Sequence, residues 1–356
     1  MGLLYTRMKI FHFREKLESL SRQSDIILPP INIRIKPTNI CNHNCSYCAY
    51  RAKGLQLGQD MDLEDYIPRD KMLEIVEDIA EMGVRAVTFS GGGDPFCYPY
   101  LLETVEQLVE KGVRFAALTN GARLSGKLAD IFAGHATWLR ISMDGWDGAS
   151  YAAYRRCPDD EFSRVMTNIS NFKKLGDSCQ LGACIVVDKN NCGHIYDLIR
   201  SLYDAGLDSV KVAPCIVSNS GSENNLYHQP LFSVVKEQIA NAMAEFKGAG
   251  FEIFDSFHTQ LESFAKGYRW CPYLQISPVI GADQNVYSCH DKAYNQKDGL
   301  LGSIRDIRFK DFWHREKGGF FDIDPSKVCN HHCVVDPSNR QILEYLDADR
   351  EHLEFV

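Results

Sequence analysis

Short apolar runs alternate with stretches of helical periodicity between residues 31 and 254. The runs are rich in β-branched residues and predict strands at 31–35, 84–89, 113–118, 138–142, 181–187 and 210–213. Helices are expected between them, because apolar residues recur at i, i+3, i+4 and i+7, as at Met72, Ile75, Val76 and Ile79. Alternating strands and helices predict an α/β fold with a parallel sheet and right-handed crossovers. Six such units suit a partial (β/α)6 TIM-like barrel over residues 31–254.

The pattern changes after residue 254. Residues 267–338 contain turns, two short strand candidates at 274–280 and 285–287, and four cysteines, which predicts a small C-terminal domain. Ile342, Leu343 and Leu346 lie on one side of a predicted helix within residues 339–356. Residues 1–30 have no clear pattern, and we treat them as an N-terminal extension.

Composition narrows the class of protein. Hydrophobic residues make up 45% and charged residues 24% of the chain, which excludes intrinsic disorder. Acidic residues (47) outnumber basic residues (39), so a general nucleic-acid-binding role is not expected. No apolar run approaches the ~20 residues of a membrane span, and the N-terminus lacks the pattern of a signal peptide. We therefore expect a cytoplasmic protein with no nucleic-acid or membrane partner.

Thirteen cysteines are the unusual feature of the composition. An odd number in a chain without a secretory signal argues against a disulfide framework. Seven of them fall in two groups, at 41–48 and 271–333, where metal or cluster ligation is the simplest interpretation. Cys184 lies within an apolar run, and most of the remaining six are expected to be small buried residues.

Cys41, Cys45 and Cys48 form a C-x3-C-x2-C motif directly after the first predicted strand. Three thiolates on one short loop can hold three irons of a 4Fe–4S cluster and leave the fourth iron open. A zinc site with His43 as a fourth ligand is the alternative. Polar or glycine-rich segments follow the next three strands, at 90–95, 119–121 and 144–145. Because parallel strands end on one rim, we expect these segments to lie near the triplet.

The triplet, in this place of a partial barrel, resembles the radical S-adenosylmethionine (SAM) superfamily over roughly residues 31–220. Gly92-Gly93-Asp94-Pro95 resembles the family's Gly-Gly-Glu-Pro segment, whose backbone receives the methionine amino group. The segment 139–145 resembles its fourth-strand motif, whose serine, here Ser142, contacts the cofactor. Tyr47 matches the aromatic residue near the adenine. Asp94 departs from the family's glutamate, which weakens a role for that side chain but not for the backbone.

The resemblance implies SAM bound to the open iron of the cluster. An electron donor such as flavodoxin or ferredoxin reduces the cluster, SAM is cleaved, and a 5′-deoxyadenosyl radical takes a hydrogen atom from the substrate. Asn120 and Asp144 are expected among the cofactor-binding residues. Arg155 or Arg156 would hold the SAM carboxylate or a substrate acid, because a guanidinium pairs bidentately with carboxylates.

The second cysteine group comprises Cys271, Cys289, Cys329 and Cys333. Four thiolates make a closed site for a 4Fe–4S cluster or for zinc, and spacing alone does not choose between them. Three nearby histidines, His290, His331 and His332, are possible substitutes for a ligand. The segment is similar to the SPASM/twitch domains of radical SAM enzymes, which implies one auxiliary cluster and two 4Fe–4S clusters in all.

The resemblance also frames the substrate. The residues before the first strand are too few for the leader-binding domain of many peptide-modifying relatives, so we expect a small hydroxylated molecule: a sugar, an aminocyclitol or a nucleotide-linked derivative. A ribosomal peptide is the alternative. Polar residues at 218–225 would suit hydroxyl recognition.

The reaction type is open between two outcomes. Net oxidation, with the auxiliary cluster accepting an electron, is favoured over epimerisation with Cys215 or Cys97 as hydrogen donor. A non-enzymatic electron-transfer or zinc protein is the interpretation from another class. It would leave the glycine segment and Ser142 without a function.

Overall fold

The computed structural model describes residues 5–20, 27–261, 264–315 and 318–355. Its strands form one sheet in the order β10-β9-β8-β1-β2-β3-β4-β5-β6-β7. The strands are β1 Asn32–Ile35, β2 Ala86–Phe89, β3 Arg114–Thr119, β4 Trp138–Ser142, β5 Gln180–Val187, β6 Ser209–Pro214, β7 Glu252–Asp255, β8 Val279–Ile280, β9 Asn285–Tyr287 and β10 Leu300–Ser303.

Strands β1 to β7 pair in parallel with their neighbours in chain order. This arrangement confirms the α/β fold and the six predicted strands, and β4 has the predicted bounds. The sequence pattern missed β7, whose residues Glu252-Ile253-Phe254-Asp255 are all only partly buried. A short strand of this kind lacks the apolar run on which the prediction depends.

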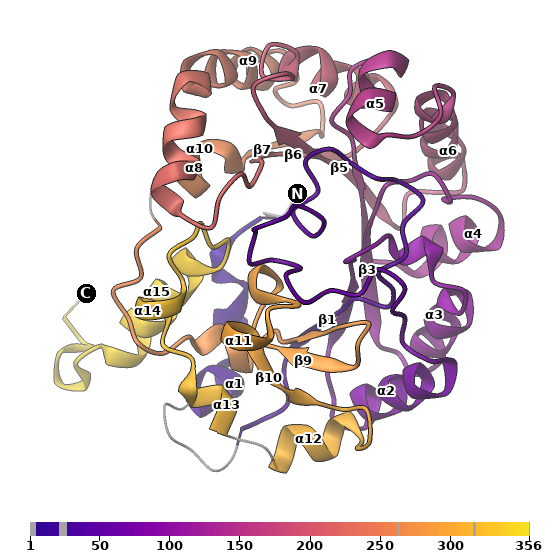
Figure 1. Cartoon of the computed structure of the whole chain (residues 1–356). Coiled ribbons are helices and arrows are strands. Elements are labelled where there is room, and N and C mark those ends of the chain that lie inside the picture. The colour runs from indigo at the N-terminus through magenta and orange to yellow at the C-terminus, as the bar shows by residue number, and fades with distance from the viewer. Residues whose placement is uncertain (1–4, 21–26, 262–263, 316–317, 356) are drawn as a thin grey trace.

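Helices surround the sheet and give the molecule the outline of a ring (Figure 1). Each presents an apolar stripe to the sheet, as α2 does with Met72, Ile75 and Ile79. The helices between β1 and β8 in the sequence are α2 Arg69–Glu81, α3 Leu101–Glu110, α4 Gly126–His135, α5 Gly148–Arg155, α6 Glu161–Lys174, α7 Ile195–Asp204, α8 Gly221–His228, α9 Phe232–Glu245 and α10 Ser256–Leu261.

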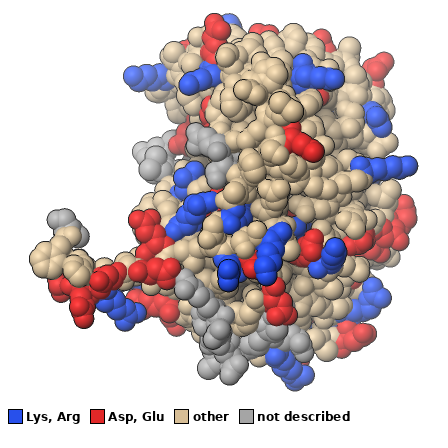
Figure 2. Space-filling view, turned by 60° about the vertical axis from the view of Figure 1, so that its left-hand side comes forward, with Lys and Arg blue, Asp and Glu red and all other residues tan. Residues whose placement is uncertain are grey.

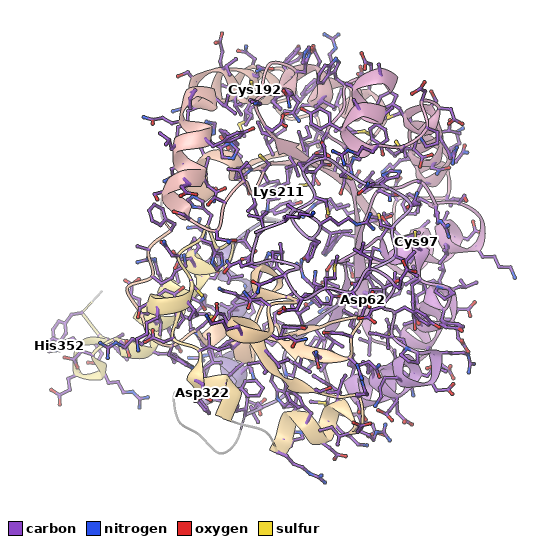
Figure 3. The ribbon with its side chains drawn as sticks, viewed as in Figure 1. Asp62, Cys97, Cys192, Lys211, Asp322 and His352 are labelled. Carbon is purple, nitrogen blue, oxygen red and sulfur yellow. The ribbon has the colours of Figure 1, made fainter. Side chains whose placement is uncertain are left out.

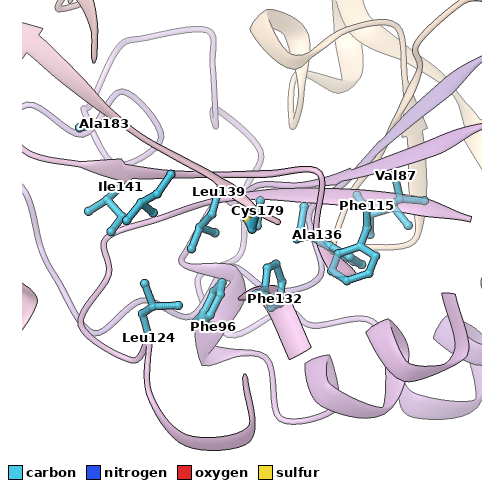
Figure 4. Packing of buried hydrophobic residues seen from close by; sticks show 14 of the residues in the cluster. Val87, Phe96, Phe115, Leu124, Phe132, Ala136, Leu139, Ile141, Cys179 and Ala183 are labelled. Carbon is cyan, nitrogen blue, oxygen red and sulfur yellow. The ribbon is translucent and has the colours of Figure 1, made fainter. Parts of the chain in front are cut away.

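The main core fills the space between the sheet and these helices. Figure 4 shows Phe96, Phe115 and Phe132 packed beside Leu139. The Phe115 and Phe132 rings meet edge to face, with centroids 5.2 Å apart. Cys179 lies in the same layer and is 1% exposed, as expected for a scattered cysteine that serves as a small apolar residue.

The C-terminal segment continues the sheet. Strand β8 pairs in parallel with β1, and β8, β9 and β10 follow one another in antiparallel pairs. The predicted strand 274–280 was wrong over most of its length: β8 comprises Val279–Ile280, and Pro272–Gln275 form a 3-10 turn. Pro278 has no N–H to donate to a ladder, which keeps the strand short. This segment also contains the helices α11 Gln296–Gly299, α12 Phe309–Arg315, α13 Gly318–Asp322 and α14 Pro325–Val328.

The two ends of the chain pack together. The 3-10 turn Arg7–His12 and α1 Arg14–Ser19 place Ile10 and Leu17 against Ile342 of the last helix, α15 Asp336–Asp347. The predicted C-terminal helix is confirmed, although it begins before residue 339. The Tyr5 ring lies tilted against that of Phe254, and its hydroxyl accepts a hydrogen bond from Arg140 of β4, so the N-terminal extension contacts the barrel.

The surface carries both charges. Figure 2 shows Lys and Arg side chains interspersed with Asp and Glu on the face toward the C-terminal segment, and the chain's C-terminal end projects from the body. Within the described ranges, no helix has the length and apolar character to cross a membrane.

Candidate active site

A cavity of about 420 Å³ lies at the carboxyl ends of the barrel strands. We call it the upper cavity. It is lined by residues from the cysteine triplet, the glycine segment after β2, the end of β6 and the C-terminal segment. Among these are Cys41, Cys45, Tyr47, Cys48, Gly92, Gly93, Asp94, Asn120, Arg155, Lys211, Cys215, His290, Asp291, His331 and His332. The structure therefore brings most of the predicted site residues to one space.

The triplet follows β1 on a loop that is fixed to the end of α5. The backbone N–H of Asn44 donates to the carbonyl of Arg155 (3.0 Å), and that of Ser46 donates to Tyr154 (2.9 Å). Burial raises the pKa of Cys41 to about 12 and also raises the pKa of Cys48. Buried thiols of this kind ionise when a metal supplies positive charge, so the donor set fits an iron–sulfur cluster.

The zinc alternative finds less support in this geometry. His43 Nε2 lies 2.8 Å from Glu161 Oε1, and both side chains are buried. That pairing ties the loop to α6. Among the residues that the structure describes, no three His, Cys, Asp or Glu side chains are grouped so as to hold a metal ion, in either cysteine group, so this spacing does not by itself separate zinc from a cluster.

The glycine segment approaches the start of the cysteine loop closely. The N–H of Gly93 donates to Thr38 (3.2 Å), and the N–H of Asp94 donates to Ile40 (3.0 Å). A Cβ on Gly93 would overlap the backbone of Asn39 and Ile40, so a side chain cannot be accommodated there. Gly92 and Gly93 expose their backbone to the upper cavity, where the resemblance places the amino group of SAM.

Both oxygens of the Asp94 carboxylate accept hydrogen bonds from groups of the protein. It accepts hydrogen bonds from the N–H groups of Phe96 (2.9 Å) and Asn120 (2.6 Å) and from the hydroxyl of Thr119 (3.0 Å). Burial raises its pKa, although these donors oppose the shift. Asp94 thus joins the glycine segment to the end of β3, and its shorter side chain serves that connection.

Asn120 extends from the same junction toward the triplet. Its amide Nδ2 donates to Asn42 Oδ1 (2.8 Å) and lies 4.0 Å from Cys41 Sγ. The Asn120 amide therefore orders the cysteine loop and also lines the upper cavity.

Asp144 holds two cavity-lining side chains from behind. Its Oδ2 accepts hydrogen bonds from the Tyr47 hydroxyl and from Arg155, and its Oδ1 accepts from the Val186 N–H (2.6 Å). Arg155 Nη1 lies 3.7 Å from Cys45 Sγ. Ser142 and Asp144 are not among the residues that line the cavity.

Of the two candidate arginines, Arg155 is the one placed at the cavity. Its side chain is buried and its Nε has no hydrogen-bond partner. Arg156 is exposed and adopts a left-handed backbone conformation (φ 48°) that ends α5. A buried guanidinium beside the triplet suits a carboxylate ligand.

The second cysteine group is assembled from three segments. Cys271 precedes the turn Pro272–Gln275, Cys289 follows β9, and Cys329 and Cys333 lie between α14 and α15. Burial raises the pKa of each thiol, that of Cys329 to about 11, and the charges of neighbouring thiols further raise the pKa of Cys289, Cys329 and Cys333. The four sulfurs thus lie within electrostatic range of one another, and as a buried thiol group they fit a soft metal centre.

Buried lysines accompany this group. Lys292 Nζ donates to the carbonyl of Val328 (2.6 Å), and Lys266 Nζ donates to that of His331 (2.8 Å). Both cations lower the pKa of Cys329. They would offset the negative charge of a thiolate-ligated cluster.

The three histidines near the second group have protein partners. His290 Nε2 lies 3.2 Å from Asp291, His331 Nδ1 lies 3.2 Å from Gln56 Nε2, and His332 Nε2 lies 3.2 Å from the carbonyl of Gly221. All three line the upper cavity.

The candidate hydrogen donors differ in position. Cys215 lines the upper cavity, is 5% exposed, and its sulfur lies 3.9 Å from His228 Nε2. Burial raises its pKa to about 12, which keeps the thiol protonated. Cys97 is not a lining residue; its sulfur contacts Asn42 Oδ1 at 3.4 Å, and Figure 3 shows it to one side of the ring's centre.

The polar rim at 218–225 is occupied by internal contacts. Residues from Gly221 onward form α8, and Asn224 Oδ1 accepts from the N–H of Val217 (2.9 Å). Asn219 donates to Gly54 (2.8 Å) and accepts from the N–H of Gln56 (2.6 Å). These side chains connect two loops, and Ser218, Asn219 and Asn224 also line the upper cavity, so hydroxyl recognition at this rim stays a prediction.

Sequence reasoning missed several polar residues of the barrel interior. Arg34 and Lys36 alternate with buried Ile33 and Ile35 along β1, and Lys211 lies on β6. This alternation places polar side chains on the face opposite the helices. The signal was present in the sequence, although a buried parallel strand is normally apolar on both faces.

Comparison with known proteins addresses the family. Residues 35–202 match the model of the Radical SAM superfamily. GTP 3',8-cyclase 2 of Pseudomonas aeruginosa is 25% identical over 176 residues, which cover 47% of this chain and 49% of that protein. An S-adenosylmethionine-dependent nucleotide dehydratase of Lacinutrix mariniflava is 30% identical over 120 residues, covering 34% and 24%. The chain thus spans about half, or less, of the length of these curated relatives.

Solved structures share the architecture. Streptococcus suis SuiB bound to the precursor peptide SuiA gives a TM-score of 0.64 at 14% identity and covers 90% of this chain and 72% of that one. The enzyme anSMEcpe with bound AdoMet gives 0.60 at 19% identity and covers 83% of both chains. At these identities the likeness concerns the fold. The family match and this fold identify residues 35–202 as a radical SAM domain, which implies a 4Fe–4S cluster and SAM.

Proposed function

We propose that this chain cleaves SAM reductively at a cluster held by Cys41, Cys45 and Cys48 and takes a hydrogen atom from a small hydroxylated substrate. The upper cavity carries the proposal, because it joins the triplet, the glycine segment, Tyr47 and Arg155 in one space. When bound, the clusters and SAM supply the one-electron chemistry and the 5′-deoxyadenosyl radical.

The chain's own residues position the reactants. The backbone of Gly92 and Gly93 faces the cavity and would receive the amino group of SAM. Arg155, fixed by Asp144 and 3.7 Å from Cys45, would receive its carboxylate, and Tyr47 would lie at its adenine. SAM and a substrate that fill this cavity of about 420 Å³ would displace water that could quench a radical.

Net oxidation of the substrate is the favoured reaction. We place an auxiliary 4Fe–4S cluster at Cys271, Cys289, Cys329 and Cys333, where it would accept the electron that the substrate radical loses. His290 and His332, which are adjacent to Cys289 and Cys333 in the sequence, line the upper cavity. The flavodoxin or ferredoxin that reduces the first cluster would be a cytoplasmic partner.

One observation favours a second reaction. Cys215 lines the upper cavity and keeps its proton, as a hydrogen-atom donor must. An epimerase would use this thiol to return a hydrogen atom to the substrate radical. Cys97, which does not line the cavity, becomes the weaker candidate.

The substrate class is drawn from two kinds of relative. The curated relatives are named for GTP cyclisation and nucleotide dehydration, which supports a nucleotide-linked molecule. SuiB binds a precursor peptide, so a peptide is the second candidate.

Anaerobic reconstitution tests the function. We expect two 4Fe–4S clusters per chain and release of 5′-deoxyadenosine when SAM and dithionite are added. Replacement of Cys41, Cys45 and Cys48 by Ser should leave one cluster and abolish 5′-deoxyadenosine. The matched control Cys179→Ser changes a buried cysteine of the core outside both groups and should retain both clusters. Stoichiometric zinc, or two clusters without SAM cleavage, would contradict the proposal.

A further inference from the structure

Four cationic side chains lie in the barrel interior: Arg34 on β1, Lys36 directly after it, Arg140 on β4 and Lys211 on β6. Lys211 points into the centre of the ring in Figure 3. The cations repel one another: burial lowers the pKa of Lys211, and the charges of Arg140 and Arg34 lower it further. Cationic groups removed from water are costly unless they are paired.

Two of the four are already engaged. Lys36 Nζ donates to the Tyr50 hydroxyl (2.5 Å) and to the carbonyl of Gly91 (3.0 Å). Arg140 donates to Tyr5 and lies over the Trp138 ring, with 5.3 Å between its central carbon and the ring centroid. These two side chains therefore have structural roles in the barrel wall.

Arg34 and Lys211 differ from them. Neither side chain has a hydrogen-bond or ion-pair partner within the ranges that the structure describes. The charge of the Asp291 carboxylate raises the pKa of Arg34, of Lys211 and also of Lys36. One carboxylate cannot balance four cations, so this interior retains an excess of positive charge.

The second cysteine group has its own cations. Lys266 and Lys292 contact its loop through the carbonyls of His331 and Val328. These lysines, and neither Arg34 nor Lys211, are the cations that lower the pKa of Cys329. Cys289 of that group lines the same inner cavity as Arg34, whereas Lys211 lines the upper cavity; within the described residues neither cation has a hydrogen bond or an ion pair to the group.

The cavities connect these side chains to the substrate space. Lys211 lines the upper cavity. Arg34 lines an adjoining inner cavity of about 450 Å³, and His290 lines both cavities. Because His290 borders both cavities and the charge of Arg34 acts on Lys211, an anion held by these two side chains would lie near His290.

We propose that Arg34 and Lys211 bind a phosphate group of the substrate, so that the enzyme acts on a phosphorylated small molecule. This inference rests on the proposed function and narrows its substrate class. A phosphate carries up to two negative charges at neutral pH, and it offers a guanidinium two oxygens, which matches the excess of cations better than one carboxylate.

Titration calorimetry on the anaerobic, reconstituted protein with SAM tests the assignment. The probes are pyrophosphate, inorganic phosphate and citrate. We expect pyrophosphate to bind and its affinity to fall at least tenfold in Arg34→Gln and in Lys211→Met. The control Lys236→Met, at an exposed position on α9, should bind as the parent does. Arg34→Lys and Lys211→Arg retain the charge and should recover most of the affinity.

The outcomes separate this inference from the proposed function. Absence of pyrophosphate binding, unchanged affinity in both neutral variants, or tighter binding of citrate would overturn the phosphate site. Release of 5′-deoxyadenosine by the parent protein reports on the function independently. If Arg34→Gln fails to retain its clusters, the pair Lys211→Met and Lys211→Arg decides.

Discussion

Asp144→Asn should destabilise the chain far more than its small chemical change suggests. Asp144 is 0% exposed, and both of its oxygens accept hydrogen bonds: Oδ1 from Val186 N–H, and Oδ2 from Tyr47 and Arg155. An asparagine keeps the shape but supplies one oxygen and one NH2 group. Whichever way the amide is turned, a donor faces a donor, and Arg155 loses its buried counter-charge.

The magnitude follows from these losses. Breaking a buried ion pair by neutralising one partner costs about 3–5 kcal/mol, because the other charge is left without compensation. With about 2 °C per kcal/mol for a large domain, the melting temperature of the anaerobic holoprotein should fall by about 5–10 °C. The affinity for SAM should fall as well, since Arg155 is no longer held beside Cys45.

Asp160→Asn is the matched control. Asp160 pairs with Arg164 at 3.1 Å, but its side chain is 72% exposed, and such surface pairs contribute about 0–1 kcal/mol. Circular dichroism under identical anaerobic conditions compares the two variants. If Asp144→Asn melts within about 2 °C of Asp160→Asn, the buried network contributes little to the stability of the fold, and the reasoning from burial is refuted.

Three further predictions concern other parts of the molecule. Gly93→Ala should abolish SAM binding, because the added Cβ would overlap the backbone of Asn39 and Ile40. The control Gly134→Ala has open space around the added Cβ in α4 and should be neutral or stabilise the fold by up to about 1 kcal/mol. SAM titration and melting curves compare the two variants. Burial lowers the pKa of Lys16 to about 7 in the folded chain. The unfolded chain therefore binds more protons between about pH 7 and 10.5, and the free energy of unfolding should rise with pH across that window. Denaturant unfolding of Lys16→Met, which cannot titrate at this position, should lack the rise. Turnover in deuterated water should give a product two mass units below the substrate if oxidation is correct, whereas one solvent deuterium at unchanged connectivity, lost in Cys215→Ala, would establish epimerisation.

Local sequence signals predicted the barrel well. The bounds of β4 and the apolar stripe of α2 follow from periodicity, because each strand and helix buries one face on its neighbours. The place of the triplet after β1 also followed, since parallel strands share a rim. These features depend on residues that are close in the sequence.

Features that depend on distant pairing were not predictable in this way. Strand β8 joins β1 across more than two hundred residues, and Gln56 meets His331 across 275 positions. The role of Asp144 as the anchor of Tyr47 and Arg155 also needs the folded barrel. Local propensity carries no information on such contacts, which tertiary packing selects.

The pairing of β8 with β1 determines when the sheet can be completed during synthesis of the chain. Until residue 280 has left the ribosome, the outer edge of β1 has no neighbour, and its free N–H and C=O groups can pair with other chains. Lys36, the residue after β1, also donates its N–H to the carbonyl of Ile280. A nascent chain that ends after residue 202 would therefore expose this seam, and an expression fragment cut at that boundary should aggregate where the full chain does not.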